Sequence, residues 1–197
     1  VCYRSNVWNI GAEGQFLFGV LAGGGFALWL TTHGIQLPQA VALPLVLVAS
    51  VLGGMAWAAI TAVLRDRFNA NEILVSLMLV YVAQQFVNYL VFGPWKDPAG
   101  FNFPQTKNFD PSTWLPLLVP GTRLNIGVLI ALVLVALTWV FMFRLFRGFQ
   151  LQVGGLAPAA ARYAGFSSSS ALWTAMMISG GLAGLAGGIE AAGTFRQ

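Results

Sequence analysis

The residues of this sequence that could do chemistry are a few uncharged polar side chains and one carboxylate, set within apolar stretches. Near the start, the stretch NIGAEGQ places Asn9, Glu13 and Gln15 among glycines. A second group lies in NEILVSLMLVYVAQQFVNYLVF, where the polar residues are Tyr81, Gln84, Gln85 and Asn88. If this stretch is helical, each residue turns by about 100°, and these four side chains share an arc of about 100°. Such a stripe could bind a polar solute through hydrogen bonds.

Each group has two interpretations. The amides of the second group could join neighbouring helices, at about 0.6–2 kcal/mol for each hydrogen bond, or they could line a solute pathway. Four polar side chains on one arc exceed what helix association needs, which favours a pathway. Glu13 could cap a helix, where it would gain from the helix dipole. Alternatively, it could lie at a broken helix beside a cavity, because irregular backbone survives at membrane depth only in such places. The chemistry of the residues leaves both interpretations open.

Other kinds of site find little support in the sequence. Cys2 is the only cysteine and His33 the only histidine, so we expect no disulfide and no metal site. The GxxxxGKS/T pattern of ATP-binding loops is absent. An integral membrane enzyme would have to use Glu13, Glu72 or Glu190, without the His, Asp or Cys clusters that usually accompany such chemistry. We therefore expect no catalytic residues.

The composition indicates the elements that hold these side chains. The chain has 197 residues, of which 57% are apolar and only 8% charged, against about 25% charged in soluble domains. Several neutral stretches reach about 20 residues, enough to cross a bilayer core of about 30 Å as a helix. We predict an all-α, polytopic transmembrane bundle with helices at about 14–32, 39–64, 71–92, 124–144 and 168–190. The first could be broken near its start.

The basic residues predict the orientation of this bundle. One side collects the arginines at positions 4, 65, 67, 144, 147 and 162, and the other has His33, Lys96, Lys107 and Arg123. Basic residues concentrate in short cytoplasmic loops, so we expect segment 93–123 to be an external loop and 144–167 a cytoplasmic loop. This placement of charge near helix ends suits a membrane protein better than nucleic-acid binding. Because the chain lacks an initiator Met, we interpret 1–197 as one transmembrane domain cut from a longer protein, without its N-terminal and C-terminal helices.

Two further patterns concern helix geometry. In PAAARYAGF, Pro158 fits the first turn of a helix and Gly165 fits its C-terminal end, which predicts a short helix outside the membrane. In the last predicted span, Gly180, Gly184 and Gly188 recur every four residues. Small residues at this spacing let helix backbones approach closely.

Three stretches together resemble the permease subunit of ABC importers of the branched-chain amino acid, ribose and nucleoside type. They are WNIGAEGQFLFGVLAG at 8–23, the long segment at 71–106, and PAAARYAGF at 158–166. The resemblance is closest to the simple-sugar and nucleoside branch. One position departs from the family pattern, because Ala157 stands where asparagine is usual, which puts a helix-capping role there in doubt.

This resemblance implies a permease dimer in the bacterial inner membrane, with a cytoplasmic ATPase that carries ATP and Mg and an external solute-binding lipoprotein. It also implies that the segment from Asn9 to Gln15 lies near the pathway. Coupling to the ATPase would fall on the 158–166 segment, through Pro158, Ala161, Arg162, Tyr163 and Gly165. We therefore expect a transport subunit for a small, neutral, hydroxylated solute such as a nucleoside or simple sugar. The alternatives are a branched-chain amino acid permease and an integral membrane enzyme.

Overall fold

The computed structural model describes residues 1–98, 100, 105–119, 121–122 and 124–195. These residues form seven α-helices and no β-strand, and their only β-type pairings are two isolated bridges, Lys96 to Thr106 and Leu117 to Asn125. The helices are α1 (Ala12–Thr32), α2 (Gln39–Phe68), α3 (Glu72–Phe92), α4 (Gly127–Arg144), α5 (Phe146–Leu156), α6 (Pro158–Tyr163) and α7 (Ser168–Glu190). Short turns of other helix types are η1 (Cys2–Ser5), η2 (Pro111–Thr113) and η3 (Ala191–Phe195).

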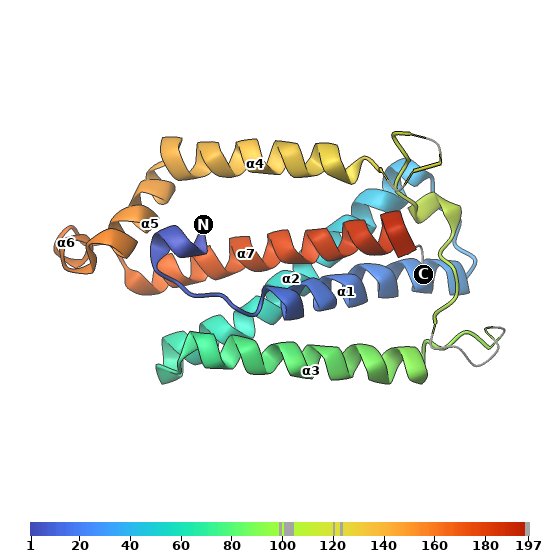
Figure 1. Cartoon of the computed structure of the whole chain (residues 1–197), viewed down its shortest axis with the longest axis horizontal. Coiled ribbons are helices and arrows are strands. Elements are labelled where there is room, and N and C mark those ends of the chain that lie inside the picture. Colours follow the sequence, from blue (N-terminus) through green and yellow to red (C-terminus); the bar gives the residue numbers. More distant parts are fainter. Residues whose placement is uncertain (99, 101–104, 120, 123, 196–197) are drawn as a thin grey trace.

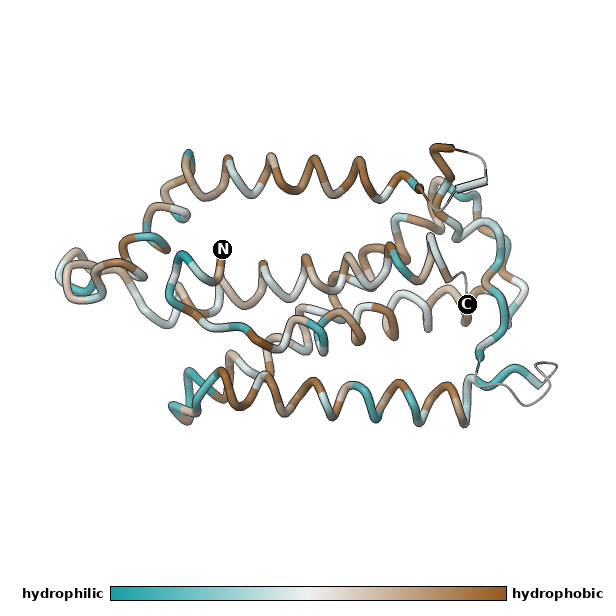
Figure 2. The backbone as a smooth tube through the Cα atoms, viewed as in Figure 1, coloured by the Kyte–Doolittle hydropathy of each residue, from teal (hydrophilic) through white to brown (hydrophobic). Residues whose placement is uncertain are grey.

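The five long helices run alongside one another, and α5 and α6 lie together at one end of the bundle (Figure 1). Each long helix is long and apolar enough to cross a membrane. The prediction of an all-α bundle with five spanning helices is confirmed. Figure 2 shows hydrophobic colour along these helices and hydrophilic colour mainly at their ends and in the loop after α3, with hydrophilic turns also inside α3.

Glycines determine how α1, α2 and α7 pack at the centre of the bundle. Gly184 of α7 leaves no room for a side chain, because a Cβ there would meet the carbonyl oxygen of Ser50 and lie 2.9 Å from Cα of Gly54. Gly180 is equally close to α2, since a Cβ added there would lie 2.5 Å from Cβ of Ala58. Gly188 packs against the side chain of Ser50. The backbones of α2 and α7 therefore touch where these glycines pass the segment from Ser50 to Ala58, which increases dispersion contacts where no hydrophobic effect acts between helices.

The two ends of the bundle differ in charge. The α6 end holds the arginines at positions 4, 65, 67, 144, 147 and 162, and the opposite end holds His33, Lys96 and Lys107. At the α6 end, Arg65 pairs with Glu72 across the turn between α2 and α3, with Nε 3.2 Å from Oε2. The positive-inside bias applied to these two ends favours the same orientation as it does on the sequence, and the cytoplasmic side of the α6 end stays a prediction.

The segment predicted as the external loop packs onto the opposite end of the bundle. Phe109 is buried among residues of α1, α2 and η3, and the backbone N–H of Leu115 donates to the carbonyl of Ala192 at 3.1 Å. Asp110 accepts a hydrogen bond from the backbone N–H of Ser112, which holds the pKa of its carboxyl below the usual value. Within the predicted loop, residues 99, 101–104, 120 and 123 lie outside the described residues.

Candidate functional site

The chain enters the bundle through a non-helical segment at the start of α1. Asn6 closes η1 in the left-handed conformation, with φ of 53°, and residues 7–10 have no regular structure. Helix α1 then begins at Ala12, beside the middle of α7 rather than level with its start (Figure 1). Helix α1 itself is continuous from Ala12 to Thr32, so the irregular segment precedes the helix, and a broken helix beside a solute cavity stays a prediction.

The side-chain amides of Asn9 and Gln15 join the irregular segment to the first turn of α1 by hydrogen bonding with each other. The Nδ2 of Asn9 donates to Oε1 of Gln15 at 2.9 Å, and the Nε2 of Gln15 donates to Oδ1 of Asn9 at 3.0 Å. Asn9 also donates to the hydroxyl of Ser179, midway along α7, at 2.9 Å. The Gln15 side chain is only 1% exposed. This pair, with Ser179, thus gives partners to the buried Gln15 amide and to the half-buried Asn9 side chain, and a buried amide without partners would be costly.

The glycines of the opening stretch allow α1 to touch α3. A Cβ on Gly11 would lie 2.8 Å from both Cβ and the carbonyl oxygen of Ser76. A Cβ on Gly14 would lie 3.0 Å from Nε1 of Trp57 and 3.2 Å from Cα of Val80. Larger residues at these positions would separate α1 from α3.

Glu13 lies in the first turn of α1 and is exposed on this chain. It is not the N-cap, which is Gly11, and the oxygen nearest the helix start is Oδ1 of Asn9, which accepts from the Gly11 N–H at 3.2 Å. A carboxylate in a first turn still gains from the helix dipole. That Glu13 lines the solute pathway stays a prediction.

The polar stripe of α3 does not lie on the face of this helix that packs against the rest of the chain. Ser76, Val80 and Ala83 are the buried residues of this helix. The predicted pathway residues of α3 are all exposed on a neighbouring face: Tyr81, Gln84, Gln85 and Asn88. Asn88 donates from Nδ2 to Oε1 of Gln85 at 3.2 Å. The stripe is therefore available to something outside the described chain.

An open groove of about 510 Å³ runs along the exposed face of α3, lined by Tyr81, Val82, Gln85, Phe86 and Tyr89 of that one helix. Two predicted pathway residues, Tyr81 and Gln85, thus line this groove. Gln84 and Asn88 are on the same helix but do not line it, and Asn9, Glu13 and Gln15 belong to the separate region around α1.

Aromatic residues that the sequence analysis missed support this side of α3. Phe18 of α1 stacks on Trp57 of α2 with ring centroids 3.7 Å apart, and both rings meet the edge or face of Phe86. The buried indole Nε1 of Trp57 has no hydrogen-bond partner among the described residues. No periodic signal distinguishes Trp57 within its apolar stretch, so its position depends on how α1, α2 and α3 cross.

The α6 end contains the short helix expected for coupling. Pro158 occupies its first turn, and Gly165 follows its end with φ of 78°, a left-handed conformation that favours glycine. Ala157 makes no side-chain cap, as its lack of a polar group requires. Ala161 faces inward and is 5% exposed, whereas Arg162 is exposed and Tyr163 is 97% exposed.

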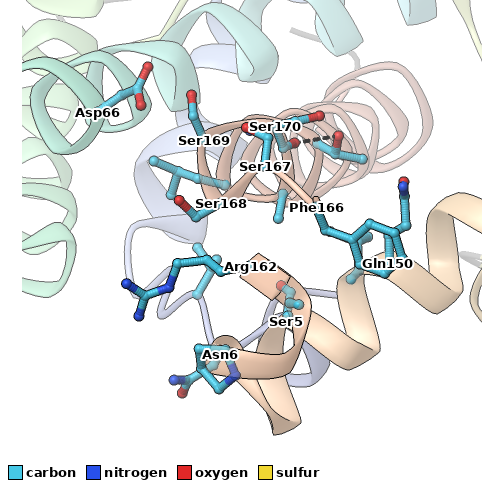
Figure 3. A pocket seen from close by; sticks show the side chains of 18 of the residues that line it. Ser5, Asn6, Asp66, Gln150, Arg162, Phe166, Ser167, Ser168, Ser169 and Ser170 are labelled. Atoms are coloured by element: carbon cyan, nitrogen blue, oxygen red, sulfur yellow. Dashed lines mark hydrogen bonds between the residues drawn. The ribbon is translucent and has the colours of Figure 1, made fainter. Parts of the chain in front are cut away.

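Behind α6 lies a larger cavity of about 870 Å³, bounded by η1, the end of α2, the starts of α3 and α7, and one side of α5. Figure 3 shows Arg162, Phe166 and the serines of α7 around it, with Asp66 and Gln150 on opposite sides. Its carboxylates have partners in the chain, because Glu72 pairs with Arg65 and Asp66 accepts from the indole N–H of Trp173 at 3.1 Å.

Helix α5, which the sequence analysis did not separate from the inner loop, connects α4 to α6. Gly148 lets it turn tightly onto Met142 and Phe141 of α4, and Gln152 donates to the carbonyl of Met142. The rings of Phe146, Phe149 and Phe166 form one cluster with centroid distances of 6.0–6.5 Å. This cluster joins α5 to the segment between α6 and α7. Phe146 and Phe149, three residues apart in the sequence, are a local pattern from which α5 could have been predicted.

These features define a bundle of packed helices that can span a membrane, and its described residues contain no group of three or more His, Cys, Asp or Glu side chains that could hold a metal ion. The chain belongs to the family described as branched-chain amino acid transport system / permease component, whose model matches residues 1–197. It is therefore a multi-pass membrane protein.

Known relatives come from the sugar and nucleoside branch. The chain is 37% identical to the glucose ABC transporter permease protein TsgB13 of Haloferax volcanii, over 97% of this chain and 51% of the relative. It is 33% identical to the guanosine ABC transporter permease protein NupP of Bacillus subtilis, over 98% of this chain and 54% of the relative. The nucleoside ABC transporter permease protein NupB of Lactococcus lactis is 26% identical over 95% of this chain and 52% of the relative. The chain thus spans about half the length of these relatives. No solved structure matches it significantly.

Proposed function

We propose that this chain forms part of the solute pathway of an ABC importer for a small, neutral, hydroxylated solute, either a nucleoside or a simple sugar. The exposed polar stripe of α3 carries the proposal. In hydrocarbon, each unpaired amide costs several kcal/mol, so Gln84, Gln85 and Asn88 need water, solute or another protein segment beside them. Uncharged amides suit a solute that has hydroxyl groups and no net charge.

The names of the relatives support this class of solute. TsgB13 is named for glucose, and NupP and NupB are named for guanosine and nucleosides. Both kinds of molecule are neutral and carry several hydroxyl groups. A branched-chain amino acid is a zwitterion, and no charged pair on α3 is available to bind its two ionic groups.

The partners follow from the same proposal. A second permease subunit would cover the α3 stripe, an external solute-binding lipoprotein would deliver the solute, and a cytoplasmic ATPase carrying ATP and Mg would supply the energy. We place the ATPase contact at α6, with Arg162 and Tyr163 as its exposed side chains. Arg and Tyr are enriched where binding energy concentrates in interfaces. The membrane would be the bacterial inner membrane.

Uptake of radiolabelled solutes tests the proposal. Cells with and without the gene for this permease are given labelled guanosine, uridine, glucose, ribose and leucine, and the binding protein is deleted in a parallel strain. We expect gene-dependent uptake of a nucleoside or a sugar that disappears with the binding protein. Gene-dependent uptake of leucine alone, or uptake that persists without the binding protein, would contradict the proposal.

A further inference from the structure

We infer that α5 lies in the surface layer of the membrane and that its exposed face, together with Arg144 and Arg147, binds an anionic phospholipid. This surface is separate from the α3 stripe, so the inference goes beyond the proposed transport function and does not depend on the solute. The evidence is the direction of the apolar face of α5, the place where this helix begins, and the charge of the arginines beside it.

Helix α5 packs against the rest of the chain through its small residues. A Cβ on Gly148 would meet the backbone of α4, and a Cβ on Gly155 would meet the backbone of η1. Leu151, on the same side of the helix, is 2% exposed. The inner face of α5 is therefore fixed by close backbone contacts, and its orientation about its own axis is determined.

The large apolar side chains of α5 point outward as a result. Phe146, Phe149 and Leu156 are 65%, 54% and 77% exposed. Their spacing of three and then seven residues places them on one face of an α-helix. An amphipathic helix whose apolar face is uncovered is typical of helices that lie in the plane of a membrane surface, with this face among the upper parts of the acyl chains.

The place where α5 begins fits such a position. Helix α4 has 18 residues, which corresponds to about 27 Å at 1.5 Å per residue and approaches the bilayer core thickness of about 30 Å. It ends at Arg144, and the backbone of Leu145 is extended, with φ of −99° and ψ of 143°. Helix α5 then leaves the axis of α4 at the α6 end of the bundle (Figure 1). It therefore begins near the level of the lipid headgroups.

Two arginines lie at the start of this apolar face. Both Arg144 and Arg147 are exposed. The guanidinium carbon of Arg144 lies 5.7 Å from the centroid of the Trp139 ring, and Arg147 donates a hydrogen bond from Nη1 to the hydroxyl of Ser170 at 3.3 Å. These contacts orient the two guanidinium groups and leave their charges without a counter-ion.

The chain supplies no carboxylate to this surface from its own part of the sequence. From residue 111 to residue 189 there is no Asp or Glu. Among the described residues the only ion pair joins Arg65 to Glu72, in the turn between α2 and α3. The surface is therefore cationic and attracts a negative group.

An anionic phospholipid complements both parts of this surface. Its phosphate can accept hydrogen bonds from the guanidinium groups, and its acyl chains can cover Phe146 and Phe149. A protein segment would have to bring carboxylates and apolar side chains together to the same depth, whereas phospholipids are present there around the whole transporter. We therefore assign the surface to lipid.

The unchanged transporter tests the class of ligand. The complete transporter is purified in an uncharged detergent and titrated with phosphatidylglycerol or phosphatidylcholine, with and without inorganic phosphate, and native mass spectrometry counts the bound lipids. We expect phosphatidylglycerol to bind more tightly than phosphatidylcholine and to persist in the presence of phosphate, which has no acyl chains. Equal affinity for the two lipids, or displacement of phosphatidylglycerol by phosphate, would overturn the inference.

Neutralising the two arginines tests the location. An arginine near an anionic surface contributes about fivefold in affinity, so Arg144→Gln, Arg147→Gln should bind phosphatidylglycerol about 25-fold more weakly. Arg67→Gln is the matched control, because Arg67 is also exposed at this end but lies beside the carboxylate of Asp66. Normal affinity in the double variant, or an equal loss in the control, would overturn the inference.

Two further variants separate charge from contact. Arg144→Lys, Arg147→Lys keeps both charges and should keep the preference for phosphatidylglycerol over phosphatidylcholine. Phe146→Gln, Phe149→Gln removes the apolar face and should weaken the binding of both lipids while the preference remains. Unchanged binding of both lipids in the phenylalanine variant, or a lost preference in the lysine variant, would overturn the inference.

Discussion

The side-chain amides of Asn9 and Gln15 face each other and exchange two hydrogen bonds, at 2.9 and 3.0 Å, beside the middle of α7. This pair explains how the irregular segment before α1 is held against the apolar bundle. Each amide satisfies the other, and Ser179 of α7 accepts the remaining donor of Asn9. The start of α1 is thereby fixed to α7 without any charged group.

Removing one member of this pair should cost more than removing Ser179. Asn9→Ala leaves the buried Gln15 amide without partners, which costs about 1–3 kcal/mol for an unsatisfied group. Ser179→Ala loses one hydrogen bond, worth about 0.6 kcal/mol in membrane helices. Thermal inactivation of the detergent-solubilised transporter measures both. The double variant Asn9→Ala, Gln15→Ala should be less destabilised than the sum of the singles, and additive effects would show that the amides do not interact.

The contact between α2 and α7 should not tolerate a methyl group at Gly184. In Gly184→Ala, the new Cβ meets the backbone of Ser50 and Gly54, which cannot move aside as a flexible side chain could. We expect a marked loss of folded transporter in the membrane. Gly154→Ala in α5 is the control, because no atom lies within 4 Å of its Cβ position. That change should be neutral or stabilise α5 by up to about 1 kcal/mol. Equal yields of the two variants would contradict the close packing.

Thiol labelling tests the topology. Cys2 is removed first; it is partly buried, its Sγ contacts the carbonyl of Ala175 at 3.4 Å, and burial raises its pKa. Single cysteines are then placed at the exposed positions Lys107 and Arg147. An impermeant reagent should label Lys107→Cys in intact cells and Arg147→Cys only after the membrane is opened. Labelling of both to the same extent in intact cells would refute the predicted sides.

Helix α6 should transmit the action of the ATPase. In the double variant Arg162→Ala, Tyr163→Ala, we expect normal insertion but at least tenfold weaker co-purification of the ATPase, since such residues carry about 1–4 kcal/mol in interfaces. If Arg162 is instead only a topological anchor, the variant will insert poorly and the inserted molecules will bind ATPase normally. Normal insertion together with normal ATPase association and stimulated hydrolysis would rule out docking at α6.

The spanning helices could be predicted from the sequence because each long apolar stretch forms its own helix. Four of the five begin or end within a few residues of the prediction, and α2 extends beyond it to Phe68. That extension carries Arg65 and Asp66, whose partners Glu72 and Trp173 belong to other helices. Charged residues suggested an end of the helix, whereas pairing across the bundle lets the helix continue.

The sites were predictable only where the signal is local. The short helix at Pro158–Tyr163 follows from Pro158 and Gly165, and the α3 stripe follows from helical spacing. The contact from Asn9 to Ser179 joins residues 170 positions apart, and the stack of Phe18 on Trp57 depends on how two helices cross. Neither leaves a periodic pattern in the sequence.

The central claim is that the polar stripe of α3 lines the solute pathway, and uptake by stripe variants tests it most directly. Gln84→Leu and Asn88→Leu each replace an amide with an apolar side chain of similar size, and Met78→Leu is a control at an exposed apolar position of the same helix. Initial uptake rates are divided by the amount of inserted permease. The account predicts at least a tenfold loss in both amide variants and a normal rate for Met78→Leu. Normal rates in both amide variants would contradict it and leave the stripe as a helix-packing surface.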